Sequence, residues 1–349
     1  EGREDRAVAL ARVAADLRST ARYSSSVRLV SRLLLLPESE RPQALSPEID
    51  KASGADLFDV AMESFIRVAD SNETAVHLFR RLADLPMAPG QAEAWVVDSA
   101  MRRRYVAVAL ARRGHLREAV REIASDLATE RDDHWWRIWQ DPFSYLAYLG
   151  AIPAEQVESV YRRGLEPGGR VENGYRRRWR GAPWWAARRD TANLAVFERR
   201  MHEAAVRDRG SPAGHRARFL EGEAAGFLAL VRGDTTGALM HFASIPDSLY
   251  EEWGPTVYVR LAEAAILAAR QDAAGARAIL DRYTGKMAGV LAVFARLQRA
   301  QVAERQGDTA TARRDFAHVV AAWRTADPEF APHVAEAKAG LARLGGAGQ

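Results

Sequence analysis

The stretch AERQGDTATARRDF, from Ala303 to Phe316, decides the fold. Helix-forming residues lead up to Gly307, and Asp308 and Thr309 follow it directly. Glycine tolerates the left-handed backbone conformation that ends many helices. Aspartate or threonine caps a new helix, because its side chain accepts a hydrogen bond from a free amide of the first turn. The stretch therefore predicts two helices joined by a tight turn.

The same pattern recurs elsewhere in the chain. A break is followed by a small residue five positions on and by a bulky apolar residue nine on. Small residues (Ala107, Gly226, Ala264 and Ala300) also stand seven positions before the breaks. Two antiparallel helices approach closely only where a small side chain lies at their crossing, so these positions are expected to be structural. The residues predicted to define the repeat are Gly114, Ala119, Gly233, Ala238, Phe242, Ala276, Leu280, Gly307, Ala312 and Phe316, with a further break at Gln271.

Amphipathic stripes with helical spacing run from end to end, and the alternation typical of strands is nearly absent. In TARRDFAHVVAAWR, the apolar positions Ala312, Phe316, Val319, Val320 and Trp323 share one helix face. The sequence therefore predicts an all-α fold. No apolar run approaches the ~20 residues that a membrane-spanning helix needs.

The repeated unit resembles the tetratricopeptide repeat, whose loose consensus combines a small residue, a Gly-Asp turn, an alanine and an aromatic residue. The breaks at Gly233, Gln271 and Gly307 are 38 and 36 residues apart, against a family value of about 34. The resemblance implies a right-handed α-solenoid of about seven to eight antiparallel helix pairs. It is good over Ala213 to Leu344, fair from Trp95 to Asp126, and degenerate between, where breaks occur near Gly150 and Asp190.

The C-terminal third is similar to the helical-repeat regions of bacterial eukaryotic-type Ser/Thr kinases and related regulators. The likeness rests on LALVRGDTTGALMHFASIPDSL, on RLAEAAILAARQDAAGARAILDRY and on the stretch that begins RAQVAERQGDTATARRDF. It implies the sensor or assembly arm of a larger bacterial protein. No kinase signature is present in these residues. We divide the chain into N-terminal helical pairs (1–127), a degenerate Trp/Arg-rich segment (128–212) and well-formed repeats with a capping helix (213–349).

Composition narrows the possible chemistry. The net charge is +4, and all basic residues except Lys51, Lys286 and Lys338 are arginines. The chain has no cysteine, which excludes disulfides, Cys-based zinc sites and iron–sulfur clusters. The eight histidines never stand at metal-ligand spacing on one helix, so we expect neither metal nor cofactor. The compartment stays open: cytoplasmic, or extracytoplasmic if the chain is part of a membrane-anchored protein.

The degenerate segment concentrates tryptophan and arginine, and three interpretations compete for it. The tryptophans could fill the helix core, could line a groove for an acidic or aromatic peptide, or could stack on single-stranded nucleic acid. The low net charge disfavours nucleic acid. The candidate partner-binding residues are Trp135, Trp136, Trp139, Tyr175, Arg176, Arg178, Trp179, Arg180, Trp184, Trp185 and Arg188.

The function predicted from these patterns is a non-catalytic protein or peptide interaction module. Binding is expected on the first helix of each pair, where aromatic and arginine side chains can be desolvated by a partner. The alternatives are an anion or nucleic-acid binder that uses the arginine clusters and an enzyme with carboxylates such as Asp132, Asp133, Glu251 and Glu252 in a cavity.

Overall fold

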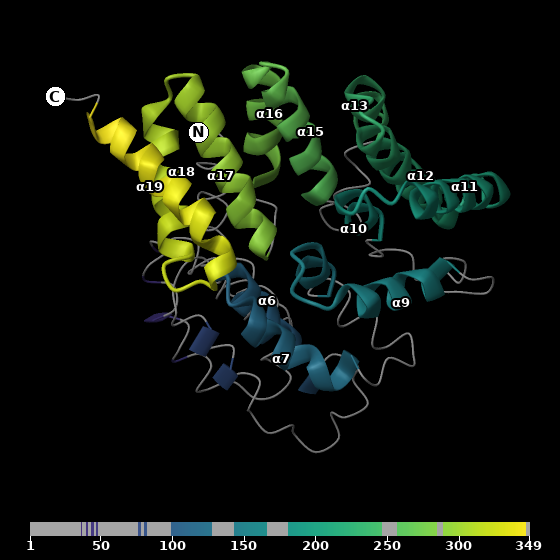
Figure 1. Ribbon diagram of the computed structural model, residues 1–349, viewed down its shortest axis with the longest axis horizontal. Coiled ribbons are helices and arrows are strands. Elements are labelled where there is room, and N and C mark those ends of the chain that lie inside the picture. Colours follow the sequence, from purple (N-terminus) through teal and green to yellow (C-terminus); the bar gives the residue numbers. More distant parts are fainter. Residues whose placement is uncertain are drawn as a thin grey trace, which may run out of the picture. The chain divides into compact units, whose positions relative to one another are not determined.

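The computed structural model describes residues 99–127, 143–165, 181–245, 257–284 and 289–346, and also residues 36, 40, 43–44, 47, 76–77 and 80–81. Every regular element in these ranges is helical (Figure 1). This confirms the all-α prediction. None of the described helices is long and apolar enough to cross a membrane.

The chain forms two compact units, and the smaller one takes in a segment from near the C-terminus. The first unit contains residues 1–129 and 321–326, and the second contains residues 130–320 and 327–349. The helices are α6 (Ser99–Arg112), α7 (Leu116–Leu127), α9 (Ala154–Leu165), α10 (Gly181–Ala187), α11 (Thr191–Arg207), α12 (Pro212–Val231), α13 (Thr235–Ala243), α15 (Val257–Ala269), α16 (Ala273–Tyr283), α17 (Val290–Arg305), α18 (Thr309–Ala322), the short η3 (Pro328–Phe330) and α19 (Ala331–Gly346).

In the described part of the first unit, α6 and α7 pack on each other through the predicted small and bulky positions. Ala107, Ala119 and Ile123 are completely buried. Trp323 belongs to this unit although it lies near the other end of the chain. Its side chain is 2% exposed, and its indole Nε1 donates a hydrogen bond of 3.0 Å to the carbonyl of Arg112, the last residue of α6.

The breaks read from the sequence are turns with a left-handed residue. Gly114, Gly233, Gln271 and Gly307 have φ between 64° and 85°, and Gly150 (74°) and Arg189 (58°) have the same conformation. At Gly307 the turn closes with two backbone bonds, from Gly307 N to Glu304 O (3.1 Å) and from Asp308 N to Ala303 O (2.9 Å). The other five turns repeat this pair of bonds, which satisfies the last carbonyls of the preceding helix.

An aspartate directly after the turn begins the next helix at four of these six places. The carboxylates of Asp190, Asp234, Asp272 and Asp308 each accept from the backbone amide three residues on, at 2.8 to 3.1 Å. Each bond satisfies one of the free amides of the first helical turn. The Gly-Asp reading of the sequence is therefore confirmed at the level of hydrogen bonds.

Two close helix crossings lie at glycines, and one of them, Gly226, is a small position predicted from the sequence. A Cβ atom at Gly226 on α12 would stand 2.2 Å from the ring of Phe242 on α13, so only glycine allows this approach. A Cβ at Gly340 on α19 would meet the ring of Phe316 on α18 at 2.4 Å. Both phenylalanines are fully buried. These rings fill the space that the missing side chains leave.

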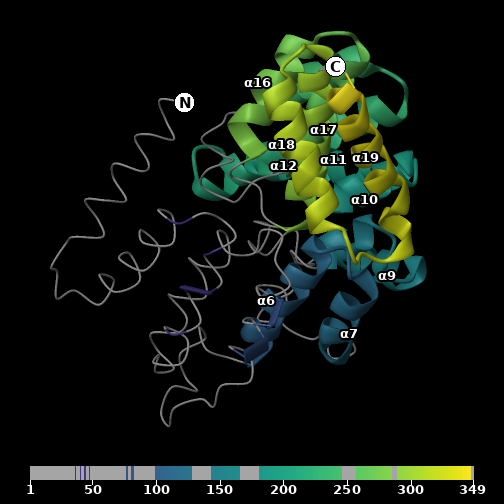
Figure 2. The same ribbon diagram turned by 90° about the vertical axis from the view of Figure 1, so that its left-hand side faces the viewer.

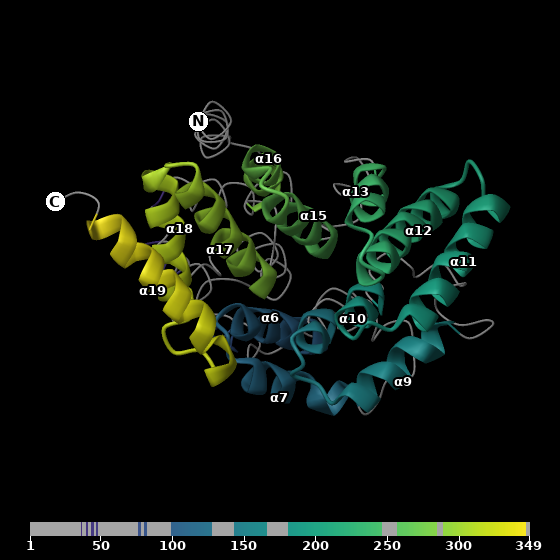
Figure 3. The same ribbon diagram turned by 45° about the horizontal axis from the view of Figure 1, so that its top comes forward.

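In the second unit, neighbouring helices in the sequence are neighbours in space. Contacts link α11 to α12, α12 to α13, α13 to α15, α15 to α16 and α16 to α17, and α10 packs on α11 and α12. Figure 3 shows α12, α15 and α17 following one another in this order. Figures 2 and 3 show α17, α18 and α19 side by side at the end of the series, in agreement with the α17–α19 contact and the Gly340–Phe316 crossing.

Candidate binding groove

An open groove of about 840 Å³ lies within the second unit. Its walls come from the helical segment 143–148 and from α10, α12, α15, α17 and α19. The first four of these labelled helices each precede a second helix across a short turn, and α19 follows the last pair. Most of the residues that line the groove therefore lie on helices that precede such a turn, and α13 contributes Thr235.

Two tyrosines form one wall. Tyr148 meets Tyr258 edge-on with ring centroids 4.9 Å apart, and Tyr145 lies 6.2 Å from the same ring. Tyr148 is 38% exposed even though it is a large aromatic residue. The surrounding protein still desolvates its phenol, which raises the pKa of Tyr148 above its ordinary value. The Tyr148 ring therefore provides an exposed apolar contact surface in the groove.

The start of α17 comes close to this wall because Gly289 lacks a side chain. Gly289 has φ 68° and directly precedes α17. A Cβ atom there would stand 2.8 Å from the ring of Tyr145. On α17, Phe294 packs edge-on against His333 of α19, with 5.0 Å between ring centroids, and it lies 6.1 Å from Phe330. Aromatic rings from the segment 143–148, α15 and α17 therefore line the groove.

Helix α15 contributes small residues to the lining of the groove. Ala262, Ala265 and Ala269 recur at helical spacing, and Ala265 and Ala269 are exposed. Leu261 and Ile266, which also line the groove, are buried. Small side chains between larger apolar ones leave a depression into which the side chains of a partner can fit.

The polar groups of the groove are few, and their charge is of one sign. Arg189 and Arg270 stand at the turns after α10 and α15, and His333 lies near the start of α19. None of the described lining residues is acidic. Both arginines are exposed, and neither forms an ion pair within the described part of the chain. The side-chain oxygen of Gln298 on α17 is buried there and accepts no hydrogen bond among the described residues.

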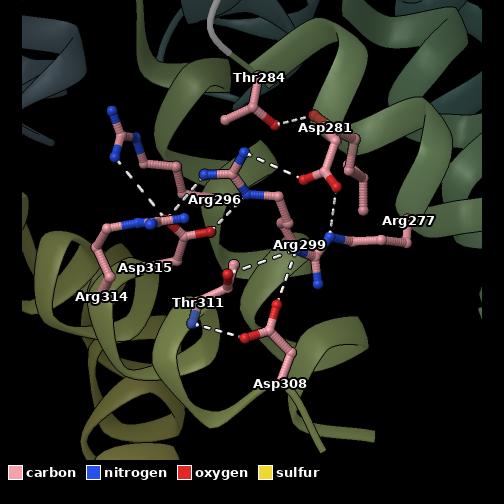
Figure 4. Close-up of polar contacts among 10 residues, drawn as sticks. Arg277, Asp281, Thr284, Arg296, Arg299, Asp308, Thr311, Arg314 and Asp315 are labelled. Atoms are coloured by element: carbon pink, nitrogen blue, oxygen red, sulfur yellow. Dashed lines mark hydrogen bonds and ion pairs between the residues drawn. The ribbon is translucent and has the colours of Figure 1, made fainter. Parts of the chain in front are cut away.

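A chain of ion pairs on α16, α17 and α18 holds the α17 wall in position (Figure 4). The carboxylate of Asp315 on α18 is fully buried and accepts two bonds from Arg299 of α17, at 2.6 and 3.0 Å. Arg299 also approaches Asp281 of α16 at 3.4 Å, and Arg277 of α16 pairs with Asp281 and Asp308 at 2.7 and 2.9 Å. Paired charges of this kind fix the helices relative to one another, because moving the helices apart would leave a buried carboxylate without its charge partner.

Few of the partner-binding residues predicted from the sequence can be placed. Trp184 and Trp185 on α10 are 2% and 0% exposed. Their rings pack on Tyr161, and the indole nitrogen of Trp185 donates to Glu158 at 3.2 Å. Arg188 is exposed and covers the Trp184 ring at 4.1 Å. The core interpretation therefore applies to these two tryptophans. Trp135, Trp136, Trp139, Tyr175, Arg176, Arg178, Trp179 and Arg180 lie outside the described residues.

The burial of Trp184 and Trp185 bears on the nucleic-acid alternative, because a buried ring has no free face for a base to stack on. The carboxylates named for the enzyme alternative, Asp132, Asp133, Glu251 and Glu252, lie outside the described residues. Within the described ranges, no group of three or more histidine, aspartate or glutamate side chains is arranged to hold a metal ion.

Comparison with known proteins adds no family assignment. No family model, curated protein or solved structure matches the chain.

The residues that line the groove were not singled out in the sequence. Tyr148, Tyr258 and Phe294 are spread over three elements, and Tyr258 and Phe294 are each the single aromatic residue of their helix. A usable signal exists on α15, where Ala262, Ala265 and Ala269 form a small-residue stripe that ends at Arg270.

Proposed function

We propose that the chain is a non-catalytic interaction module built as a TPR-like α-solenoid. On this proposal the helices joined at the six left-handed turns are antiparallel pairs of a repeat. The turns at Gly114, Gly150, Arg189, Gly233, Gln271 and Gly307 support this, since they follow one another at intervals of 36, 39, 44, 38 and 36 residues. Arg189 and Gly150 extend the series through the segment where the sequence pattern is degenerate.

The observation that carries the functional proposal is the groove of the second unit. It is apolar, it is open, and first helices supply nearly all of its lining. Stacked repeats present their first helices on one continuous surface, and repeat proteins use such surfaces to bind partner segments. The groove therefore receives a segment of a partner protein. The resemblance to bacterial regulators extends this proposal to a sensor or assembly arm of a larger protein.

Blocking the groove tests this proposal. Ala265 of α15 is exposed and lines the groove, so Ala265→Trp adds an indole there without displacing a buried contact. We expect this variant to lose the proteins that the wild-type chain captures from an extract, as quantified by mass spectrometry. The thermal unfolding midpoint is expected to change little.

The matched control is Ala310→Trp, an exposed alanine on the second helix α18 that is not among the groove-lining residues. It is expected to keep the captured proteins. If both variants capture the same set as the wild-type chain, the groove is not the binding surface and the proposal is wrong.

A further inference from the structure

The groove combines three features that together describe the chemistry of an occupant. Most of its lining residues are apolar, its charged lining residues are basic, and it holds a buried hydrogen-bond acceptor that has no donor among the described residues. Such a groove takes a ligand that brings apolar side chains, negative charge and N–H groups. A peptide segment with carboxylates beside apolar residues supplies all three.

The carboxylates of such a ligand would bind at the C-terminal ends of α10 and α15. Arg189 lies in the turn directly after α10 and Arg270 directly after α15, so both stand where a first helix finishes. Neither arginine forms an ion pair in the described part of the chain, although many other described arginines do. An unpaired guanidinium beside an apolar surface attracts a carboxylate more strongly than one in open water, because the apolar wall limits screening.

An N–H group of such a ligand would donate a hydrogen bond to Gln298 within the groove. Gln298 lies on α17, and its buried side-chain oxygen has no donor within the part of the chain that the structure describes. A buried acceptor that lacks a partner is costly, so a ligand that donates to it gains binding energy. A peptide offers backbone and side-chain N–H groups along its length. A fatty acid or another acyl carboxylate offers apolar surface and charge but no such donor.

We propose that the groove binds an acidic, apolar peptide segment of a partner protein, with its carboxylates paired to Arg189 and Arg270. This inference rests on the proposed function and names the class of partner. Apolar side chains of the segment lie over Ala262, Ala265 and Ala269 and against the rings of Tyr148 and Phe294. A donor of the segment bonds to Gln298.

Selection from a phage-displayed library of random dodecapeptides against the full chain tests the proposal. We retain only peptides that the wild-type chain binds and the Ala265→Trp variant does not. The expected sequences are rich in leucine, isoleucine or phenylalanine together with aspartate or glutamate. Retained peptides that are rich in lysine or arginine, or that carry no charge, would overturn the proposed chemistry.

The strongest retained peptide then serves as the probe in calorimetric titrations. Changing both Arg189→Glu and Arg270→Glu is expected to weaken its binding by a factor on the order of ten or more, because each attraction becomes a repulsion. A version of the peptide with lysine at its acidic positions is expected to bind this variant better than the wild-type chain. Arg189 has φ 58°, but both residue types carry a Cβ atom, so backbone strain is comparable in the variant.

Arg199→Glu is the matched control, since Arg199 is an exposed arginine of α11 that does not line the groove. It should leave the binding of the probe within about twofold of wild type, as a distant surface charge does in physiological salt. An equal loss in the control and in the groove variant means that only net charge matters, and overturns the proposal.

Two further outcomes separate this inference from the proposed function. If peptides bind and Ala265→Trp blocks them while the arginine reversals change nothing, the groove binds peptides but the carboxylate pairing is wrong. If no peptide is retained, but a fluorescent long-chain fatty acid binds the wild-type chain and not Ala265→Trp, the occupant is a small acyl carboxylate and both proposals fail.

Discussion

Asp308 shows how much one side chain contributes to a turn of this fold. Its carboxylate accepts from the Thr311 amide at 3.1 Å and from Arg277 at 2.9 Å. The hydrogen bonds from Thr311, followed by the bond from Arg277, lower the pKa of Asp308 to about 2. The same residue therefore caps α18 and ties it to α16.

The low pKa of Asp308 predicts a stability change in acid. Because the folded-state pKa lies below the unfolded value of ~3.9, the stabilisation is fully present above pH ~4 and is lost as the pH falls towards 2. We expect the difference in unfolding free energy between wild type and Asp308→Asn to shrink over this range. Urea denaturation at several pH values from 5 to 2.5 measures it.

Asp234→Asn is the control for this experiment. Asp234 caps α13 through Gly237 at 2.8 Å, but it forms no ion pair within the described part of the chain. Comparing the two variants measures the combined contribution of Arg277 and the Thr311 hydroxyl, which Asp234 lacks. A difference for Asp308→Asn that stays constant from pH 5 to pH 2.5 would contradict the assigned pKa.

Single residues were also where sequence reasoning worked best. Gly307 and Asp308 predict a turn because glycine readily adopts the left-handed conformation and aspartate readily caps the helix that follows. Gln271 was recognised only by its place in the series. Arg189 was missed, because its side chain gives no hint of a left-handed backbone and only the neighbouring Asp190 marked the place.

At the scale of helices, packing depends on a few positions without side chains. Gly340→Ala on α19 is expected to destabilise the protein by about 1–3 kcal/mol, the usual cost of overpacking. The added Cβ would stand 2.4 Å from the buried Phe316 ring. Chemical denaturation of wild type and variant measures the cost.

Gly345 supplies a control on the same helix, since a Cβ there meets nothing within 4 Å. Gly345→Ala should be neutral or should stabilise by up to ~1 kcal/mol, because alanine favours the helix more than glycine does. Equal effects at the two glycines would show that helix propensity, and not the α18–α19 crossing, determines the result.

The groove was harder to foresee than the helix pairs. A first helix such as α15 packs on α16 and also lines the groove, so apolar residues occur on more than one of its faces. Periodicity alone cannot assign Tyr258 or Phe294 to one face or the other. The sequence predicts binding on first helices as a class. It identifies none of the residues that line the groove.

At the scale of the molecule, Trp323 adds to the first unit a buried side chain from a segment near the C-terminus. Trp323→Ala is expected to loosen this unit, because it removes a buried ring and the hydrogen bond to Arg112. Large-to-small changes of this kind typically cost about 3–5 kcal/mol. Hydrogen exchange measured on peptides from α6 and α7 should become faster.

Trp323→Phe keeps an aromatic ring but removes the N–H donor, so it should accelerate exchange less than Trp323→Ala. Unchanged exchange in α6 and α7 for both variants would contradict the role assigned to Trp323. The sequence placed Trp323 on an apolar helix stripe. It gave no means of finding a partner 211 residues away, because local patterns carry no information about such distant pairs.

The membership of residues 321–326 in the first unit also bears on synthesis by the ribosome. Between Arg112 and Trp323 the ribosome must add 211 residues, which takes roughly 10 to 40 s at elongation rates of about 5–20 residues per second. During this interval the nascent chain carries α6 without its tryptophan partner. The order of emergence from the exit tunnel therefore gives a chaperone time to act on the first unit before its last segment arrives.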